Sequence, residues 1–201
     1  LDYKFHVFEN VSNKTLKRQS DNNFIRILIT SKYLPIYYKI KLEQILNHTP
    51  FNCKIIYFYK ADGGGFGIDL NILLKNIQFS KLHALTRLDD DDGLYTDFIK
   101  NVRKITTNEN CDKIYSLVYG INYQYNKQKI EYGVPVIFPK IALGLTYINC
   151  KEYFDMDKIA MGGHTKMKVK KKKFIFDRQK NSFFLNADSN TCDSRRNLYL
   201  N

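Results

Sequence analysis

The chain has 201 residues, of which 44% are hydrophobic and 26% charged, and its formal net charge is +12. These values are those of an ordinary globular protein and exclude a disordered chain or a fibre. The length fits one domain over residues 1–201 with a substantial core. No apolar run in the sequence is long enough for a membrane span.

The first part of the chain predicts an alternation of helices and strands. Residues 4–19 repeat apolar side chains near the helical period, and residues 24–30 form an apolar strand. Residues 36–47 are expected to form a helix, and residues 53–58 the next strand. We expect the inward face of that helix to carry Ile40, Ile45 and Leu46.

The alternation continues through the middle of the chain. Residues 69–77 are predicted to be a helix, residues 82–88 a short apolar strand, and residues 95–105 another helix. Strands and helices alternating at these lengths indicate an α/β fold with a mostly parallel central sheet. The glycine-rich segment 61–67 matches neither the dinucleotide fingerprint nor a phosphate loop. We therefore expect a flexible connection between strand and helix, which could also form a lid over a ligand.

The pattern changes after residue 112. Residues 113–119, 129–138 and 141–148 are extended, aromatic and joined by short loops, as in antiparallel meanders. Residues 168–201 are polar and basic with weak periodicity, and we expect a weakly structured tail there. The fold class predicted from the whole chain is therefore α/β.

Four consecutive carboxylates, Asp89–Asp92, follow the strand predicted at 82–88. Adjacent like charges repel one another, and this repulsion calls for a cation or full solvation. The ends of such strands are where open α/β sheets bind ligands. Alternate residues of an extended chain share a face, so Asp89 and Asp91 could converge on one ion with Asp92 close behind. Hard oxygen ligands of this kind suit Mg²⁺ or Mn²⁺. The alternative is a solvated acidic turn that caps a helix after Gly93.

These residues carry a family resemblance. Residues 87–94, Arg-Leu-Asp-Asp-Asp-Asp-Gly-Leu, resemble the Arg-x-Asp-x-Asp-Asp-x-Leu signature of bacterial rhamnosyltransferases. Phe8 and residues 14–24 are similar to a second segment of that family, although Lys14 and Thr15 replace its usual Pro-Ser. Residues 163–167 resemble its late histidine segment. The resemblance spans residues 4–167.

The resemblance implies a glycosyltransferase of the nucleotide-diphospho-sugar (GT-A) fold, whose Asp-x-Asp motif binds a metal–diphosphate. It implies metal ligands at Asp89, Asp91, Asp92 and His164, and donor contacts at Arg87 and Asp89. The family also has a strand before the Phe8 segment that helps hold the nucleotide base. Little precedes that segment here, so we expect a first strand to be missing and the donor pocket to be incomplete.

His164 has two readings. Gly162 and Gly163 give its backbone freedom, and a neutral imidazole could complete the metal shell formed by the Asp run. A single histidine is otherwise a structural or surface residue. If the sugar is transferred with inversion, a carboxylate base must deprotonate the acceptor hydroxyl. The candidate bases, which the sequence does not rank, are Glu131, Glu152, Asp155 and Asp157.

The basic run Lys168–Lys173 could contact an anionic membrane or steer a charged sugar nucleotide. A strand edge protected by lysine is the alternative. No nucleic-acid motif accompanies the 15 Tyr and 14 Phe residues, so we expect no nucleic-acid partner. The cysteines are widely scattered, which favours reduced thiols in a cytosolic protein; they are Cys53, Cys111, Cys150 and Cys192.

Together these features predict a glycosyltransferase that uses Mn²⁺ or Mg²⁺. The donor would be a nucleotide-diphospho-sugar, with rhamnose as the candidate sugar, and the acceptor a glycan or a lipid-linked acceptor. We expect a cytoplasmic enzyme that can lie peripherally at the inner membrane face. One alternative is a metal-dependent phosphoryl or nucleotidyl transferase, and another is a non-catalytic basic binding module on a degenerate transferase fold.

Overall fold

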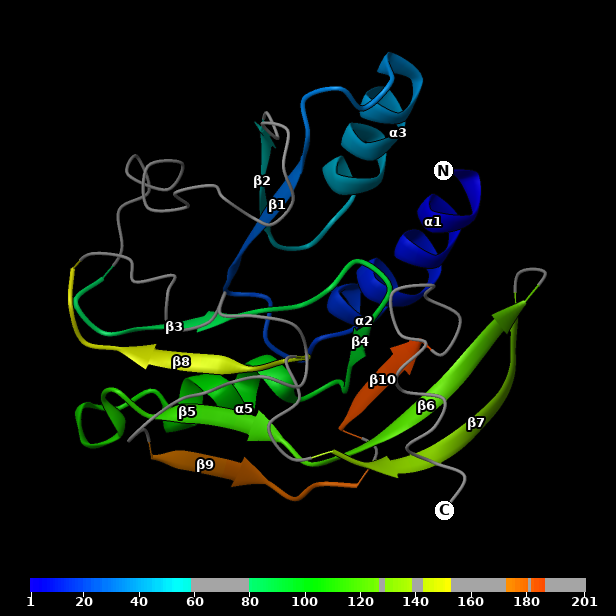
Figure 1. The fold of residues 1–201 in the computed structure, drawn as a ribbon. Helices are drawn as coiled ribbons and strands as arrows, with labels where there is room; N and C mark the ends of the chain where they lie inside the picture. The colour runs from blue at the N-terminus through cyan, green and yellow to red at the C-terminus, as the bar shows by residue number, and fades with distance from the viewer. Residues whose placement is uncertain (59–79, 127–128, 139–142, 153–172, 181, 187–201) are drawn as a thin grey trace, which may run out of the picture.

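A mixed α/β fold is seen in the computed structural model, in which the described strands form three sheets (Figure 1). The described helices, all from the first 110 residues, pack beside these sheets. The described residues are 1–58, 80–126, 129–138, 143–152, 173–180 and 182–186.

The N-terminal part agrees with the sequence prediction. A continuous helical segment is followed by two strands that flank a helix. The two strands pair in parallel, from Ile25 opposite Asn52 to Ser31 opposite Phe58. The elements are α1 (Asp2–Val7), the π-helix η1 (Phe8–Asn13), α2 (Lys14–Lys17), β1 (Ile25–Ser31), α3 (Ile36–Asn47) and β2 (Asn52–Phe58).

Helix α3 packs with one face against β1, β2 and α1. Leu42, Ile45 and Leu46 are buried there, and the rings of Phe5 and Tyr38 lie 4.9 Å apart. The prediction that Ile40 faces inward is wrong, because its side chain is 49% exposed. At about 100° per residue, Ile40 falls on the side of the helix opposite these buried residues.

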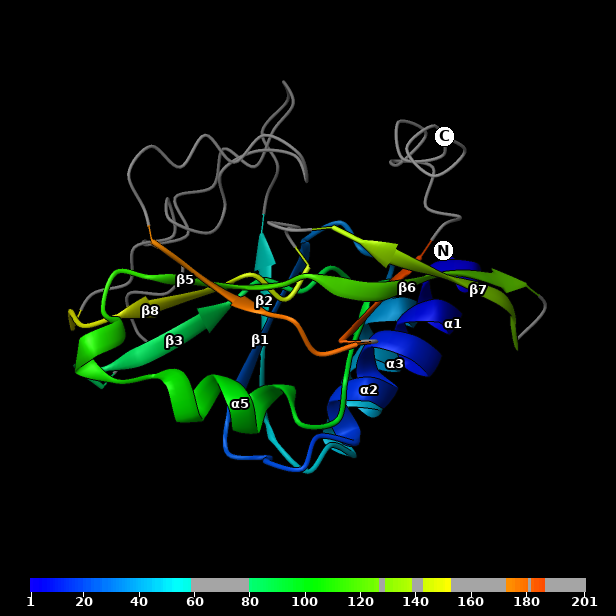
Figure 2. The same ribbon diagram turned by 90° about the horizontal axis from the view of Figure 1, so that it is seen from below.

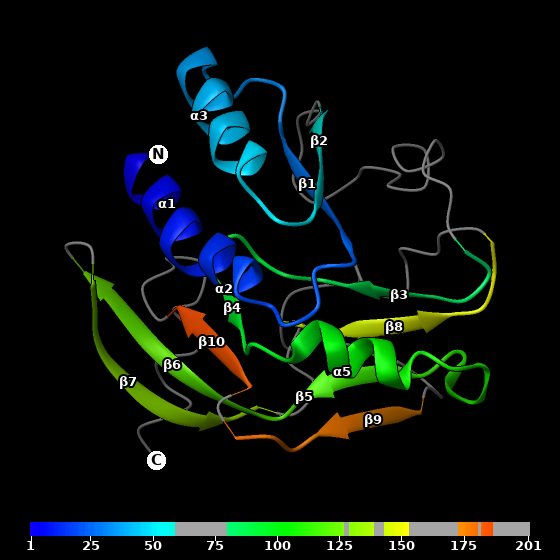
Figure 3. The same ribbon diagram turned by 180° about the vertical axis from the view of Figure 1, so that it is seen from behind.

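A second sheet has the strand order β3-β8-β5-β9, and helix α5 covers one of its faces (Figures 2 and 3). Phe98 and Val102 of that helix are buried in the same apolar cluster as Leu117 of β5. The elements are β3 (His83–Thr86), α5 (Phe98–Ile105), the short 3₁₀ helix η2 (Asn108–Asn110), β5 (Ile114–Leu117), β8 (Thr146–Asn149) and β9 (Phe174–Asp177).

The third sheet has the order β4-β10-β6-β7. Strands β6 and β7 form an antiparallel hairpin, with Tyr123 opposite Gly133. The extended segment predicted at 129–138 corresponds to β7, whereas most of β6 lies outside the predicted segments. Strand β4 follows the Asp run and joins the sheet through β10. The elements are β4 (Gly93–Leu94), β6 (Tyr119–Asn126), β7 (Lys129–Ile137) and β10 (Phe183–Asn186).

The expected mostly parallel central sheet is wrong for the described strands. Their seven pairings comprise three parallel and four antiparallel ones. The difference arises at β3, which pairs antiparallel with β8 instead of extending the parallel pair β1–β2. Strand pairing over such distances in sequence depends on which apolar faces meet, and local periodicity does not contain that information.

The weakly structured tail predicted for residues 168–201 is also partly wrong. Strand β9 pairs in parallel with β5, and β10 pairs in parallel with β6. Each is only four residues long, so its sequence signal is weak, and Phe183 of β10 is nevertheless fully buried. Two segments of this region thus complete the sheets. Residues 168–172 and 187–201 lie outside the described part.

The cysteines differ from the expectation of reduced thiols. Cys111 and Cys150 form a disulfide, with their Cα atoms 5.8 Å apart. The antiparallel pairing of β5 with β8 brings these two loop ends together across 39 residues of sequence. Cys53 is a free, partly buried thiol, and Cys192 lies outside the described residues. Disulfides are rare in reducing compartments, so the expectation of a cytoplasmic protein loses this support.

The predicted helix 69–77 and the glycine-rich segment 61–67 lie outside the described residues. Among the helices that the structure describes, none combines the length and apolar character that crossing a membrane requires.

Candidate active site

The Asp run forms a turn where two sheets meet. It leaves β3 after Thr86 and enters β4 at Gly93, and Figure 1 shows this connection passing beside α1 and α2. Asp90 and Asp91 are turn residues, and the Asp92 amide donates to the Asp89 carbonyl at 3.4 Å.

The prediction of an extended run with Asp89 and Asp91 on one strand face is therefore wrong. The alternative, an acidic turn, has the right backbone shape. Its expected role as a helix cap is not seen, since α5 begins only at Phe98 and follows an N-cap at Asp97. Full solvation is not seen either, because Asp92 is 2% exposed.

Backbone pairing fixes the chain as it enters the turn. The Arg87 amide donates to the Leu145 carbonyl at 3.0 Å, and the Arg87 carbonyl accepts from the Gly144 amide at 2.9 Å. These bonds continue the β3–β8 pairing. Gly144 has a φ of 65°, a left-handed conformation that glycine adopts without steric penalty. The first residue of the signature is thus held before the carboxylates begin.

The exit from the turn is held by the N-terminal helical segment. The Leu94 amide donates to Thr15 Oγ1 at 3.3 Å, and Thr15 Oγ1 donates to the Ser12 carbonyl at 3.0 Å. A Cβ atom at Gly93 would lie 2.9 Å from Thr15 Cγ2, so a glycine permits this close approach. The two best-matching segments of the family resemblance therefore meet in space.

Gln19 joins the same two regions. Its side-chain amide donates to the Tyr95 carbonyl at 2.8 Å, and its Oε1 accepts from the Ile99 amide at 3.0 Å. The side chain is 4% exposed, so these bonds form inside the protein. Gln19 therefore docks the end of α2 against the first turn of α5.

Strand β6 provides a third support. Tyr123, which is fully buried, donates its hydroxyl hydrogen to the Asp91 carbonyl at 2.6 Å. The backbone of the turn is thus bound by the β8 side of one sheet, by the N-terminal helices and by a strand of another sheet. These bonds fix the backbone that carries the four carboxylates.

Three carboxylates of the run each interact electrostatically with a basic side chain. Arg87 Nε lies 3.3 Å from Asp89 Oδ1. The charge of Lys4, on α1, lowers the pKa of Asp91, and the charge of Asp90 acts on Arg26, on β1. Asp90 is exposed, and Asp89 and Asp91 are half-buried. Basic side chains from three different parts of the chain therefore interact with the acidic turn.

Burial is the main cause that raises the pKa of Asp91 to about 6, and the charges of Asp90 and Asp89 add to it. At neutral pH this carboxylate is ionised although partial burial and two neighbouring negative charges disfavour its charged form. A bound cation would stabilise the charged form, and carboxylate oxygens suit hard divalent ions.

Within the described residues, no group of three or more His, Cys, Asp or Glu side chains is arranged to hold a metal ion. The described residues thus offer at most two such side chains to one ion, so a metal bound here would need further ligands, such as the phosphates of a substrate.

The other predicted site residues are less well placed or not described. Glu152 is exposed and follows β8 at the end that pairs with the start of β3, so it lies away from the Asp run. Glu131 belongs to β7, two residues from Gly133, the partner of Tyr123. The side chain of Glu131 lies outside the described part, as do Asp155, Asp157, His164 and residues 168–172.

Three residues at the turn were not predicted from the sequence. Lys4 and Tyr123 carry no local signal that separates them from other lysines and tyrosines. Arg26 does carry one, because it interrupts the apolar run from Phe24 to Leu28. Burial lowers its pKa to about 10, with the Asp90 charge acting in the opposite direction.

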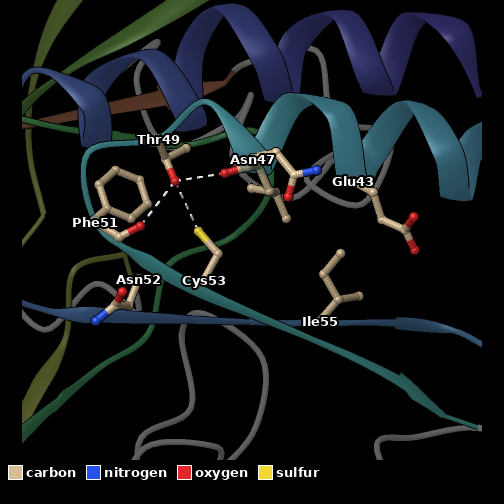
Figure 4. A pocket seen from close by; sticks show the side chains of 8 residues that line it. Glu43, Asn47, Thr49, Phe51, Asn52, Cys53 and Ile55 are labelled. Carbon is tan, nitrogen blue, oxygen red and sulfur yellow. Dashed lines mark hydrogen bonds between the residues drawn. The ribbon is translucent and has the colours of Figure 1, made fainter.

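A small pocket of about 200 Å³ lies elsewhere, between α3 and β2 (Figure 4). Glu43, Phe51 and Cys53 line part of it. Thr49 Oγ1 lies 3.4 Å from Cys53 Sγ and donates to the Leu46 carbonyl. The pocket includes none of the predicted site residues, so the candidate active site remains the Asp turn.

Comparison with known proteins supports the resemblance. Residues 1–134 match the model of a family described as "Putative rhamnosyl transferase". No curated protein and no solved structure matches the chain. The matched residues include the acidic turn, the N-terminal helical segment and Arg26, whereas the predicted His164 lies beyond them. Because the match covers about two thirds of the sequence, the chain belongs to this rhamnosyl transferase family and is a glycosyltransferase.

Proposed function

We propose that this protein transfers a sugar, with rhamnose as the candidate, from a nucleotide-diphospho-sugar with the help of Mn²⁺ or Mg²⁺. The observation that carries the proposal is the acidic turn, whose backbone is held at the junction of two sheets. The family match supports the enzyme class. A GT-A-like arrangement belongs to this proposal and is supported by the parallel β1-α3-β2 unit and the Asp run.

The reaction breaks the bond between the anomeric carbon and the phosphate oxygen of the donor. The electron pair of that bond stays on the phosphate oxygen, so a nucleoside diphosphate leaves. The acceptor oxygen forms the new bond to the anomeric carbon, and its proton passes to a base. A bound divalent ion supplies electrostatic stabilisation of the charge on the leaving diphosphate.

In this proposal the residues of the turn bind and orient the donor. Asp91 is the foremost metal ligand, because its half-buried carboxylate lies in a field that a cation would relieve. Asp89 takes a metal or ribose contact, and Arg87 orients it through their ion pair. Asp92 and His164 remain predicted ligands. Among the candidate bases, Glu131 belongs to β7, which pairs with the strand that carries Tyr123.

The acceptor is proposed to be a glycan or a lipid-linked acceptor. Contact with an anionic membrane through Lys168–Lys173 would suit the second of these. Lys173, the described member of this run, is exposed, and its carbonyl accepts from the Ile114 amide at 3.0 Å. Its backbone is thus fixed to β5 while its side chain faces solvent.

Thermal unfolding tests the metal assignment. Mn²⁺ together with UDP, GDP or dTDP should raise the melting temperature, because the ligands bind the native state preferentially. Replacing Asp91 and Asp92 together by Asn should abolish this shift while circular dichroism shows a folded protein. An unchanged shift in the double variant would refute the assignment. Release of a nucleoside diphosphate from the donor marks sugar transfer, whereas release of a sugar 1-phosphate marks nucleotidyl transfer.

A further inference from the structure

Arg26 is a charged residue in the otherwise apolar strand β1, and its described partners are all neutral. Its Nη1 donates to Asn13 Oδ1 at 2.9 Å, and its Nη2 donates to Ser12 Oγ at 3.2 Å. Its guanidinium carbon lies 4.7 Å from the centre of the Phe8 ring. Across the described residues the ion pairs are Arg87–Asp89 and Arg103–Asp21, so no carboxylate there pairs with Arg26.

A charged side chain at this position of the strand lowers the stability of the fold if its role is only structural. Arg26 is half-buried, and even partial removal of a guanidinium from water has a free-energy cost unless an anion compensates, whereas an apolar side chain would pack in a strand without that penalty. The groups that hold it, Ser12 and Asn13, are themselves buried, with 0% and 1% exposure. A guanidinium has five N–H donors, and two of them are used in the described structure.

A short chain of hydrogen bonds links this guanidinium to the acidic turn. Ser12 and Asn13 belong to η1, and the Ser12 carbonyl accepts from Thr15, which in turn accepts from the amide of Leu94, two residues after the run. The carboxylate of Asp90 acts electrostatically on Arg26. A π-helical turn such as η1 is rare and is often found at functional sites. Arg26 is therefore connected to the candidate site through η1, whereas Arg87 reaches it through Asp89.

We propose that Arg26 is an anion subsite that binds the diphosphate of the nucleotide-sugar donor. This inference rests on the proposed function and adds a contact from β1, which no part of the family signature includes. A planar guanidinium matches phosphate oxygens with two parallel hydrogen bonds. In the free protein Asn13, Ser12 and Phe8 hold its plane in place, so little side-chain freedom is lost when the anion binds.

The chemical role follows from where charge develops. When the sugar leaves, the phosphate oxygen that carried it gains negative charge. A guanidinium bound to the diphosphate would stabilise this charge, and the carboxylates of the turn would hold the divalent ion that also offsets it. Arg26 makes and breaks no covalent bond.

Calorimetric titration of purified variants tests this proposal. Arg26→Met keeps a long apolar stem and removes the charge, and Arg103→Met is the matched control, because Arg103 pairs with Asp21 away from the turn. Each variant is titrated with Mn²⁺ alone, and with UDP, GDP and dTDP in the presence of Mn²⁺. For Arg26→Met we expect at least about tenfold weaker binding of the nucleoside diphosphate that the unmodified protein prefers. Binding of Mn²⁺ alone should be unchanged or tighter, since a nearby cation has been removed.

The possible outcomes separate this proposal from the proposed function. If the unmodified protein binds no nucleoside diphosphate with Mn²⁺, the proposed function fails first. If it does bind one and Arg26→Met binds it equally well, the Arg26 subsite is refuted while the function stands. Equal weakening of Mn²⁺ and of the nucleotide would mark Arg26 as structural and also refute the subsite. Should Arg26→Met not fold, Arg26→Lys keeps the charge without the planar fork, and wild-type nucleotide affinity in that variant would contradict the proposal.

Discussion

Tyr123 and Asp91 are joined by a 2.6 Å hydrogen bond from the tyrosine hydroxyl to the aspartate carbonyl, across 32 residues of sequence. Because the tyrosine is fully buried in a strand, it fixes the backbone of the acidic turn to the β6–β7 hairpin. The position of the carboxylates therefore depends on a part of the chain that the signature does not include.

Tyr123→Phe should destabilise the fold by about 1 kcal/mol, since it removes one buried hydrogen bond and keeps the ring. It should also reduce the thermal shift given by Mn²⁺ and a nucleoside diphosphate, because the turn loses a support. Urea unfolding and thermal shift assays measure the two effects. Tyr57→Phe is the control, because the Tyr57 hydroxyl contacts exposed Glu43 at 3.4 Å. Equal effects of the two substitutions would contradict the role assigned to Tyr123.

Asp91→Asn should stabilise the metal-free protein at about pH 8 and have little effect below about pH 4. The pKa of Asp91 in the folded protein is raised to about 6 by burial and by its neighbours. The wild-type protein therefore loses stability as pH rises through about 6, where this carboxyl ionises, and the neutral amide does not. A gain of roughly 1–3 kcal/mol at the higher pH corresponds to a shift of this size, reduced for partial solvent screening.

Urea unfolding of both proteins across this pH range, with a chelator present, measures the gain. Glu109→Gln serves as the control, because Glu109 is exposed in η2. A stability difference that is the same at high and low pH would show that Asp91 does not titrate as described.

Gly93→Ala should destabilise the protein by about 1–3 kcal/mol, because the added methyl would lie 2.9 Å from Thr15 Cγ2. Thr15→Ser removes that methyl and keeps the hydroxyl that binds the Leu94 amide. The penalty of Gly93→Ala should therefore be smaller in the Thr15→Ser background. A double-mutant cycle by urea unfolding measures this coupling, and strictly additive effects would contradict the contact.

Reduction of the Cys111–Cys150 disulfide should lower stability by about 3–4 kcal/mol, as expected for a bond that closes a loop of 39 residues. Unfolding with and without reductant measures the loss. The Cys111→Ser, Cys150→Ser double variant should match the reduced protein and should not respond to reductant, while Cys53→Ser should respond as the wild type does. An equal response to reductant in the wild type, the double variant and Cys53→Ser would show that this disulfide does not cause the loss of stability.

The sequence predicted the elements whose signals are local. The helix at 36–47 and the strands on either side of it follow from apolar spacing, and the structure confirms them with small shifts at their ends. The family signature also identified the segments around Thr15 and the Asp run, which are in contact. Local patterns and a short motif were sufficient for these features.

The sequence did not predict which strands pair or how the Asp run is shaped. Strand β3 pairs with β8, some 60 residues later, and β9 and β10 insert into two different sheets. These pairings depend on burial between distant segments, so a window of neighbouring residues does not contain them. The run adopts a turn because β8, Thr15 and Tyr123 bind its backbone on three sides. Arg26 was visible only as a charge within an apolar strand.

Release of nucleoside diphosphate from a panel of nucleotide-diphospho-sugars, including dTDP-rhamnose, tests the central claim most directly. We predict Mn²⁺- or Mg²⁺-dependent turnover that Asp91→Asn reduces by about 100-fold or more. Asp97→Asn should retain activity, because Asp97 is exposed and bonds Ser20 at the start of α5. Turnover in Asp91→Asn that equals the wild type, or turnover that persists unchanged in a chelator, would contradict the assignment of the acidic turn as the active site.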